Sequence, residues 1–254
     1  MVRLDSVRLD QLLFDKGLFA SREKARRAVM AGVVLVDGQR VDKAGTPIKP
    51  DARLELIEDT EPFVSRAGRK LAHALDTFAV DPAGLICLDV GASTGGFTDC
   101  LLQRGAKRVY AFDVGYGQLD DRLRRDERVV VRERINARHL QPGDLPEPAE
   151  LVTVDVSFIS LLKVVPALLP LMAPGALLLT LIKPQFEAGR HQIGKGGIVR
   201  SEEIRRSVID ARAAELAALG LEPRGLVDCE LKGMEGNQEA FAAFRLLSAG
   251  GAAP

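Results

Sequence analysis

Residues 87–106, CLDVGASTGGFTDCLLQRGA, decide the fold of this chain. The apolar run that ends at Val90 is typical of a buried strand, and the three glycines of GASTGG form a turn. Apolar residues after this turn recur at helical spacing until Gly105, which ends the helix. A strand, a glycine-rich turn and a helix in this order predict the beginning of an α/β sheet.

Apolar strands alternate with helical segments over the rest of the C-terminal part. The predicted strands are Leu85–Val90, Val109–Asp113, Val129–Val131, Leu151–Val156, Ala176–Ile182 and Gly225–Glu230, with Ala242–Leu247 as a final edge strand. Continuous apolar strands separated by helices are typical of parallel sheets that are covered on both faces. We therefore predict an α/β fold with a doubly wound, mostly parallel, Rossmann-like sheet.

Composition limits the class of protein. The 254 residues are 46% hydrophobic, and 35 basic side chains balance 35 acidic ones. At about 150 residues per domain, this length accommodates one large and one small domain. Three scattered cysteines and three histidines form neither a disulfide framework nor a metal motif, so we expect no metal. The N-terminus, MVRLDSVRLD, lacks the apolar segment of a signal peptide, which predicts a cytoplasmic protein.

The uncharged segment Val164–Ile182 bears on the prediction of a cytoplasmic protein, because its 19 residues approach the length of a membrane span. Pro166, Pro170 and the pair Pro174-Gly175 divide it into short pieces. We predict a helix that ends near Met172, a Pro-Gly turn and a buried strand, and hence no membrane segment.

The first 60 residues are predicted to be a separate α+β domain, followed by a linker (residues 61–64) and a large domain (residues 65–254). Ser21 can cap the second of two helical segments, SREKARRAVMA. The stretch VVLVDGQRV predicts a hairpin whose turn is Asp37-Gly38, and RLELI predicts a last strand.

Positive charge gathers in this small domain although the whole chain is neutral. Residues 3–49 contain ten basic and six acidic side chains, a net charge of +4. Such a basic helix face can be merely solvated, or it can bind phosphates. The candidate RNA-binding residues are Arg3, Arg8, Arg22, Lys24, Arg26 and Arg27, with Arg66 in the large domain.

Residues 7–55 resemble a small RNA-binding module that a ribosomal small-subunit protein shares with pseudouridine synthases and tyrosyl-tRNA synthetases. The segments SREKA and GVVLVDG carry most of the resemblance. It implies two helices packed on a short hairpin, with the second helix lying along structured RNA. This mode of binding depends on RNA shape and backbone.

Two aspartates flank the glycine-rich turn of the large domain. Asp89 ends the first strand of the sheet, where it would repel a pyrophosphate and attract the ammonium and sulfonium of S-adenosylmethionine. Asp113 ends the second strand, 22 residues after Gly91, where a carboxylate can bind both hydroxyls of a ribose. This combination resembles class I methyltransferases, with a nicotinamide enzyme or plain α/β packing as the alternative.

Further cofactor contacts are expected along the same edge. The glycines let the backbone approach a ligand at a helix N-terminus, and Asn136 follows the third strand, where it can face the adenine. The predicted cofactor-binding residues are Asp89, Gly91, Ser93, Thr94, Gly95, Gly96, Phe97, Asp113, Asn136 and Asp155.

Four charged residues occupy the strand ends and turns where α/β sheets build their sites: Lys70, Asp155, Lys183 and Glu239. Each by itself is typical of a solvated charge. Together they place two ammonium groups and two carboxylates near a methyl donor. A ribose 2′-hydroxyl ionises far above neutral pH, so its attack on a methyl group needs a base or stabilisation of the developing oxyanion. Lysines can supply either, and no metal is required.

These four residues in this order resemble the FtsJ-like ribose 2′-O-methyltransferases. The motifs VSRAGRKL, LDVGASTGGFT, TVDVSFISL, LIKPQFE, GKGGIVR and KGMEGNQE resemble the hemolysin-A-type (TlyA) ribosomal RNA methyltransferases over nearly the whole chain. The resemblance implies S-adenosylmethionine as cofactor, ribosomal RNA or a ribosomal subunit as partner, and the four charged residues as the catalytic set. The chain departs from the family at CELKGME, which lacks the usual prolines, so we expect the loop that carries Glu239 to be less rigid.

Two other classes of function stay open at this point. A membrane-active hemolysin would need an amphipathic or spanning segment, and prolines interrupt the candidate. A non-catalytic RNA-binding assembly factor would have no need of two lysines beside a cofactor turn. We therefore expect a monomeric RNA methyltransferase that binds no membrane.

Overall fold

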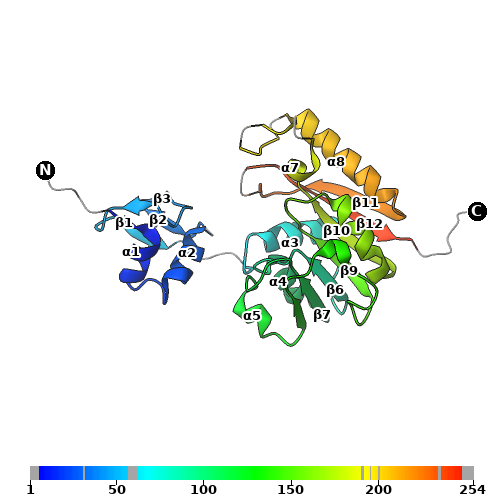
Figure 1. Cartoon of the computed structure of the whole chain (residues 1–254), viewed down its shortest axis with the longest axis horizontal. Coiled ribbons are helices and arrows are strands. Elements are labelled where there is room, and N and C mark those ends of the chain that lie inside the picture. Colours follow the sequence, from blue (N-terminus) through cyan, green and yellow to red (C-terminus); the bar gives the residue numbers. More distant parts are fainter. Residues whose placement is uncertain are drawn as a thin grey trace, which may run out of the picture. The chain divides into compact units, whose positions relative to one another are not determined.

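The structure is a computed structural model that describes residues 6–30, 32–56, 62–189, 192–194, 196–199, 201–233 and 236–247. The chain divides into two compact units, Met1–Pro62 and Phe63–Pro254 (Figure 1). The predicted RNA-binding residue Arg3 lies outside the described residues. So do residues 57–61, the last of which is the first residue of the predicted linker.

The N-terminal unit packs two helices on short antiparallel strands. Its elements are β1 (Val7–Arg8), α1 (Leu9–Asp15), α2 (Arg22–Met30), β2 (Val34–Val36), β3 (Gln39–Arg40), β4 (Pro47–Ile48) and β5 (Leu54–Leu56). Ser21 Oγ accepts a hydrogen bond from the backbone N–H of Lys24, as expected of a helix cap. Asp37 and Gly38 both have positive φ, which confirms the two-residue hairpin turn between β2 and β3.

Helical spacing explains the orientation of α2. Ala25 and Val29 are four residues apart and fully buried with Leu9 and Leu13 of α1. The arginines of α2 are exposed, because they lie on the opposite side of the helix.

The C-terminal unit is built on a seven-stranded sheet in the order β11-β12-β10-β9-β6-β7-β8. The strands are β6 (Ile86–Val90), β7 (Arg108–Phe112), β8 (Val129–Arg132), β9 (Ala149–Val154), β10 (Met172–Ile182), β11 (Leu221–Asp228) and β12 (Ala240–Leu246). The five strands from β10 to β8 are parallel, and β12 is antiparallel to both of its neighbours. The predicted doubly wound, mostly parallel sheet is thereby confirmed.

The last strand is not at the edge, contrary to expectation. β12 lies between β10 and β11, and β11 is the edge strand. The physical reason is burial on both faces of β12: Phe241 and Phe244 point to opposite sides, and each is at most 1% exposed. Several residues in the middle of β11 are exposed, which suits an edge.

The uncharged segment 164–182 also differs in detail from expectation. Helix α6 (Val165–Leu168) and a short 3₁₀ turn, η3 (Leu169–Leu171), end before Met172, and β10 begins at that residue. The pair Pro174-Gly175 falls inside β10, at the irregularity in its pairing with β9. No helix in the described part of the chain is long and apolar enough to cross a membrane.

Helices cover both faces of the sheet (Figure 1). α3 (Ala67–Thr77) and α4 (Gly96–Gln103) pack on one face, in an apolar cluster with Leu179, Leu181 and Phe241. α6 and α8 (Glu202–Ala217) belong to the cluster on the opposite face. The short helices α5 (Asp121–Arg124) and α7 (Pro184–Glu187) follow β7 and β10, and the 3₁₀ turns η1 (Ala137–His139) and η2 (Leu161–Lys163) follow β8 and β9.

The beginnings of α3 and α4 are in direct contact because glycines stand there. A Cβ atom on Gly96 would lie 2.3 Å from Ser65 Oγ and 2.9 Å from the backbone nitrogen of Gly68. A Cβ atom on Gly68 would lie 2.4 Å from the ring of Phe63. The close approach brings the first turn of α3, with Lys70, over the end of the sheet where the glycine-rich turn lies.

This packing predicts that Gly96→Ala destabilises the protein by about 1–3 kcal/mol, the usual effect of overfilling a packed site. An alanine at an ordinary helix position would instead stabilise by up to ~1 kcal/mol relative to glycine. The free energy of unfolding, measured in urea for both proteins, shows whether Gly96→Ala destabilises or stabilises the protein. Adding Ser65→Ala to Gly96→Ala should recover part of the loss, because it removes the closest atom. A Gly96→Ala variant as stable as its parent would contradict the packing.

Candidate active site

The four charged residues that the sequence singled out meet at the carboxyl edge of the parallel strands. Ile182 of β10 is paired with Ala240 of β12, so Lys183 and Glu239 are the next residues on adjacent strands. Asp155 follows Val154, the last residue of β9, whose partner on β10 is Thr180. Side chains alternate between faces along a strand, and this alternation directs all three toward the face that α3 covers. Lys70 reaches them from the first turns of α3.

The cluster is organised as two ion pairs. Lys70 Nζ donates a hydrogen bond of 2.6 Å to Glu239 Oε2, and these side chains are 12% and 3% exposed. Lys183 Nζ pairs with Asp155 Oδ1 and also donates a 3.0 Å hydrogen bond to Ser157 Oγ. Separation of the two partners of such a buried pair would leave each charge uncompensated. Each carboxylate therefore holds the Nζ atom of its lysine in one place.

Backbone packing joins this cluster to the glycine-rich turn. The backbone N–H of Asp155 donates a 2.9 Å hydrogen bond to the carbonyl of Val90. A Cβ atom on Gly91 would lie 2.1 Å from the carbonyl oxygen of Asp155, so only glycine fits there. The turn after β6 and the carboxylate after β9 are therefore immediate neighbours.

Hydrogen bonds hold the described part of the loop that carries Glu239. Cys229 N–H donates to the carbonyl of Glu239 at 2.8 Å. The Asn237 side chain is 2% exposed, accepts from Val199 N–H and donates to the carbonyl of Gly197, both at 3.0 Å. Glu239 itself is buried. Met234 and Glu235 lie outside the described residues.

Asp89 has a different environment from the one the sequence suggested. Its carboxylate is 0% exposed and accepts hydrogen bonds from Thr98 Oγ1 of α4 at 2.7 Å and from Thr153 Oγ1 of β9 at 3.1 Å. Burial is the main cause that raises the pKa of Asp89 to about 7. The carboxylate thus links β6, β9 and α4 beneath the site, and the geometry offers no surface for direct contact with a ligand.

The raised pKa predicts how Asp89 affects stability. An unfolded aspartate ionises near pH 4, whereas the folded one keeps its proton to about pH 7. Between these values the folded state binds more protons, so the contribution of Asp89 to the free energy of unfolding falls as pH rises. Asp89→Asn should remove this decline.

Urea unfolding of both proteins from pH 4.5 to 8 tests this prediction. The advantage of the parent over Asp89→Asn should shrink steadily as pH rises. A constant difference across the range would show that Asp89 titrates at an ordinary pKa.

The other predicted cofactor residues lie around the turn after β6. Asp113, half-buried at the end of β7, accepts from Ser93 N–H at 2.8 Å and from Gly115 N–H at 2.6 Å. Ser93 and Thr94 are exposed, and Ser93 has a positive φ of 49°. Asn136 is also exposed and caps the turn η1, accepting from Arg138 N–H at 3.2 Å.

Two of the predicted residues have evident packing roles. A Cβ atom on Gly95 would lie 2.2 Å from Leu123 Cδ1, so this glycine makes room for a neighbouring side chain. The ring of Phe97 is 5.7 Å from that of Phe241 and 3% exposed. Any cofactor contact of Phe97 would have to be through its backbone.

The donor set fits S-adenosylmethionine. Each carboxylate oxygen of Asp113 takes one backbone N–H and keeps a further lone pair for a ribose hydroxyl. The exposed residues Ser93 and Thr94 lie directly beside it, because Ser93 N–H donates to Asp113. When bound, the cofactor supplies an electrophilic methyl group at the edge where the two lysines lie. The individual contacts stay predictions.

The predicted RNA-binding arginines are exposed but paired. Arg8 and Arg22 both contact the buried carboxylate of Asp10, at 3.0 and 3.1 Å. Glu23 lies near two further arginines of α2, Arg26 and Arg27. Lys24 and Arg66 are exposed. Asp10 orients two guanidinium groups while leaving about half of each accessible.

Sequence reasoning missed one candidate at the rim of the site. Phe158 is 89% exposed, and its φ of 64° is a strained value for an aromatic residue. Its ring centroid lies 4.8 Å from that of Phe186 on α7. The available signal was an aromatic residue three positions after Asp155, next to Ser157.

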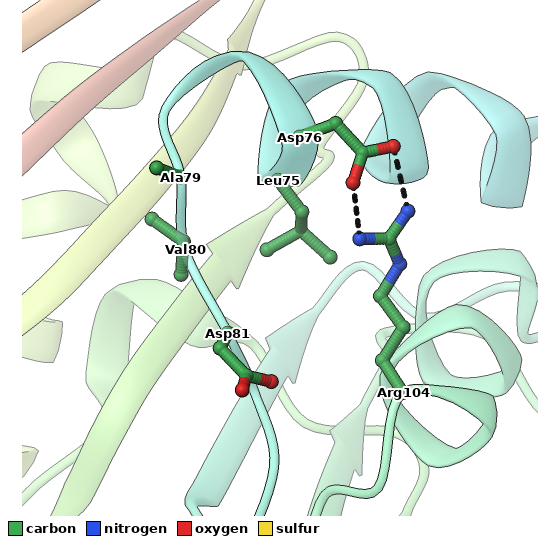
Figure 2. Close-up of a pocket in the computed structure, with 6 residues that line it drawn as sticks. All are labelled: Leu75, Asp76, Ala79, Val80, Asp81 and Arg104. Carbon is green, nitrogen blue, oxygen red and sulfur yellow. Dashed lines mark hydrogen bonds and ion pairs between the residues drawn. The ribbon is translucent and has the colours of Figure 1, made fainter.

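A pocket of about 440 Å³ lies elsewhere (Figure 2). It is lined at the C-terminal ends of α3 and α4, where Arg104 makes a two-point ion pair with Asp76 at 2.5 and 2.8 Å. Asp81 on its rim precedes β6, so the pocket belongs to the amino edge of the sheet, opposite the four charged residues. Among the described residues, no group of three or more His, Cys, Asp or Glu side chains could hold a metal ion.

A mostly parallel seven-stranded sheet with a glycine-rich turn after β6 and charged residues at the carboxyl edge defines a class I methyltransferase domain. Residues 63–246 match the FtsJ-like methyltransferase family, and residues 7–54 match the S4 domain. The chain therefore belongs to the FtsJ-like methyltransferase family and carries an N-terminal S4 domain. The predicted enzyme class is confirmed, and S-adenosylmethionine is its cofactor.

Similar proteins cover nearly the whole chain. It is 48% identical to the "Putative rRNA methyltransferase YqxC" of Bacillus subtilis over 91% of this chain and 83% of that protein. It is 44% identical to the 16S/23S rRNA (cytidine-2'-O)-methyltransferase TlyA of Mycobacterium tuberculosis over 94% of this chain and 89% of that one. A solved structure, "Putative hemolysin from Streptococcus thermophilus", superimposes with a TM-score of 0.76 at 42% identity, covering 96% of this chain and 90% of that one.

Proposed function

We propose that this protein transfers the methyl group of S-adenosylmethionine to a ribose 2′-hydroxyl of ribosomal RNA. The observation that carries the proposal is the pair of lysine–carboxylate contacts, Lys70–Glu239 and Lys183–Asp155, beside the glycine-rich turn. The relatives named for ribosomal RNA methylation, and TlyA for cytidine 2′-O-methylation in particular, support the substrate. The S4 domain supports binding to structured RNA.

The site suits an oxygen nucleophile. The 2′-oxygen must lose its proton while it bonds to the methyl carbon, and negative charge develops on it. The ammonium groups of Lys70 and Lys183 stabilise this charge, in a setting where burial strengthens the interaction. Glu239 and Asp155 hold the two Nζ atoms in position and provide carboxylate oxygens that can take up the proton. Alignment of the oxygen with the methyl group contributes much of the rate.

Lys70→Ala and Lys183→Ala should each lower kcat for RNA methylation by about 10²–10⁴-fold, because each removes a charge that acts in the transition state. Binding of S-adenosylhomocysteine, measured by calorimetry, should change little. Digestion of the RNA product and mass spectrometry would identify the 2′-O-methyl nucleotide.

Lys163→Ala is the matched control, since Lys163 is an exposed lysine on η2 outside the cluster. It should methylate at the parental rate. Normal methylation by Lys70→Ala and Lys183→Ala, with a folded protein and bound cofactor, would refute the catalytic assignment. A methyl group on a base instead of the ribose would refute the reaction.

We further propose that Phe158 stacks on the base of the nucleotide that is methylated. A base held outside its helix can stack on an aromatic ring. The exposed Phe158 directly follows Ser157, which accepts a hydrogen bond from Lys183, and lies three residues after Asp155. Phe186 supports the ring from α7.

Phe158→Ala should lower kcat/KM for RNA by roughly 5- to 150-fold, the range for loss of one stacked base. Phe158→Tyr should retain most activity, because the ring is kept. The free energy of unfolding should hardly change, since the side chain is exposed. Equal kcat/KM values for the parent and Phe158→Ala would rule out stacking.

The setting that we propose is a cytoplasmic monomer. All four charged residues come from one chain, which supports activity without a second subunit. Cys87, Cys100 and Cys229 are free and buried, which suits a reducing compartment. The N-terminal unit would bind RNA through its exposed arginines and present one ribose to the C-terminal unit.

A further inference from the structure

A second exposed aromatic side chain lies beyond the cofactor turn. Tyr116, between β7 and α5, is 69% exposed, and the guanidinium carbon of Arg134 lies 4.2 Å from the centroid of its ring. This distance is typical of a cation–π contact. Neither residue belongs to the lysine–carboxylate cluster.

Several hydrogen bonds hold this pair in place. Arg134 N–H donates to the carbonyl of Gly115 at 3.0 Å, and Gly115 N–H donates to Asp113 Oδ1 at 2.6 Å. Glu133 accepts from Gly117 N–H at 3.0 Å and pairs with Arg124 of α5. Arg134 has a positive φ of 59°, a value that a non-glycine residue rarely adopts. The loop after β7 and the segment after β8 thus form one platform, which we call the Tyr116–Arg134 platform.

Charges of both signs lie around the platform. Three nearby carboxylates are each paired with an arginine: Asp120 with Arg122, Asp126 with Arg128, and Glu133 with Arg124. Three exposed arginines, at the last residue of β8 and beyond it, are different: within the described residues, Arg132, Arg134 and Arg138 make no ion pair. Their charge is available to an anionic partner.

The position of the platform relates it to the substrate. β8 is the edge strand opposite β11, and four strand spacings separate it from β10, which Lys183 follows. At about 4.8 Å per spacing, this separation is ~19 Å along the carboxyl edge. Stacked nucleotides rise about 3.4 Å each, so an RNA strand would cover that distance with roughly five or six nucleotides.

We propose that the Tyr116–Arg134 platform, with Arg132 and Arg138, is a second RNA contact that binds substrate several nucleotides from the methylated ribose. Tyr116 and Arg134 take an unpaired base by stacking, which is a common mode of recognition of single-stranded RNA. Arg132 and Arg138 bind the adjoining phosphates. The proposal rests on the proposed function and adds a contact on the methyltransferase domain, separate from the S4 domain.

Steady-state methylation of a ribosomal RNA transcript tests the stacking contact. Tyr116→Ala and Arg134→Ala should each raise KM for RNA roughly tenfold and leave kcat at saturating RNA unchanged. Tyr116→Phe should behave like the parent, because the ring is kept, whereas Arg134→Lys should resemble Arg134→Ala in part, because the planar group is lost. Arg206→Ala, which removes an exposed arginine of α8, is the matched control and should have no effect.

Salt dependence tests the phosphate contacts. The double variant Arg132→Ala/Arg138→Ala should reduce the slope of log affinity against log salt by roughly 1.5, as expected for two lost phosphate contacts. A slope equal to that of Arg206→Ala would overturn this part of the proposal.

The platform borders Asp113, so its residues could instead belong to the cofactor site. Binding of S-adenosylhomocysteine distinguishes this alternative from RNA binding. All platform variants should bind it as the parent does. A parallel loss of cofactor affinity would assign the platform to the cofactor site, and an unchanged KM for RNA would remove it from RNA binding. Failure of the proposed function would be distinct, since the parent itself would then form no 2′-O-methyl nucleotide.

Discussion

The close packing around the glycine-rich turn is the constraint on which the C-terminal unit depends. Gly91 allows the carbonyl of Asp155 to approach β6, and Gly96 allows the start of α3 to approach α4. These contacts draw together segments that are distant in the sequence. A side chain at either glycine would separate the cofactor turn from the residues that act on the substrate, so the requirement for glycine is as much structural as chemical.

Burial of the four clustered charges is tolerated at this edge because each lysine pairs with a carboxylate. Glu239 and Lys70 come from segments about 170 residues apart and meet through one short hydrogen bond. Asp89, directly beneath, is stabilised by two threonine hydroxyls and by a raised pKa, and therefore needs no cation. The two ion pairs and the raised pKa of Asp89 together lower the cost of burying these five groups side by side.

Some features could be predicted because they depend on neighbours in the sequence. The Asp37-Gly38 turn requires residues that tolerate positive φ, and the strand, turn and helix of residues 87–106 follow from local apolar spacing. The place of β12 could not be predicted, because strand order depends on which strand is buried on both faces. The exposure of Phe158 and the burial of Asp89 likewise depend on elements far away in the chain.

The sequence by itself determined the class of fold, the division of the chain into a small and a large unit, and which charged residues to expect in the site. Residue types and short-range apolar periods carry this information. Only the tertiary structure decided which lysine pairs with which carboxylate, that Asp89 lies under α4, and that Tyr116 and Arg134 form a platform beside Asp113. The physical reason is that sheet register and helix packing bring these side chains within a few ångströms of one another. Neither can be inferred from spacing along the chain.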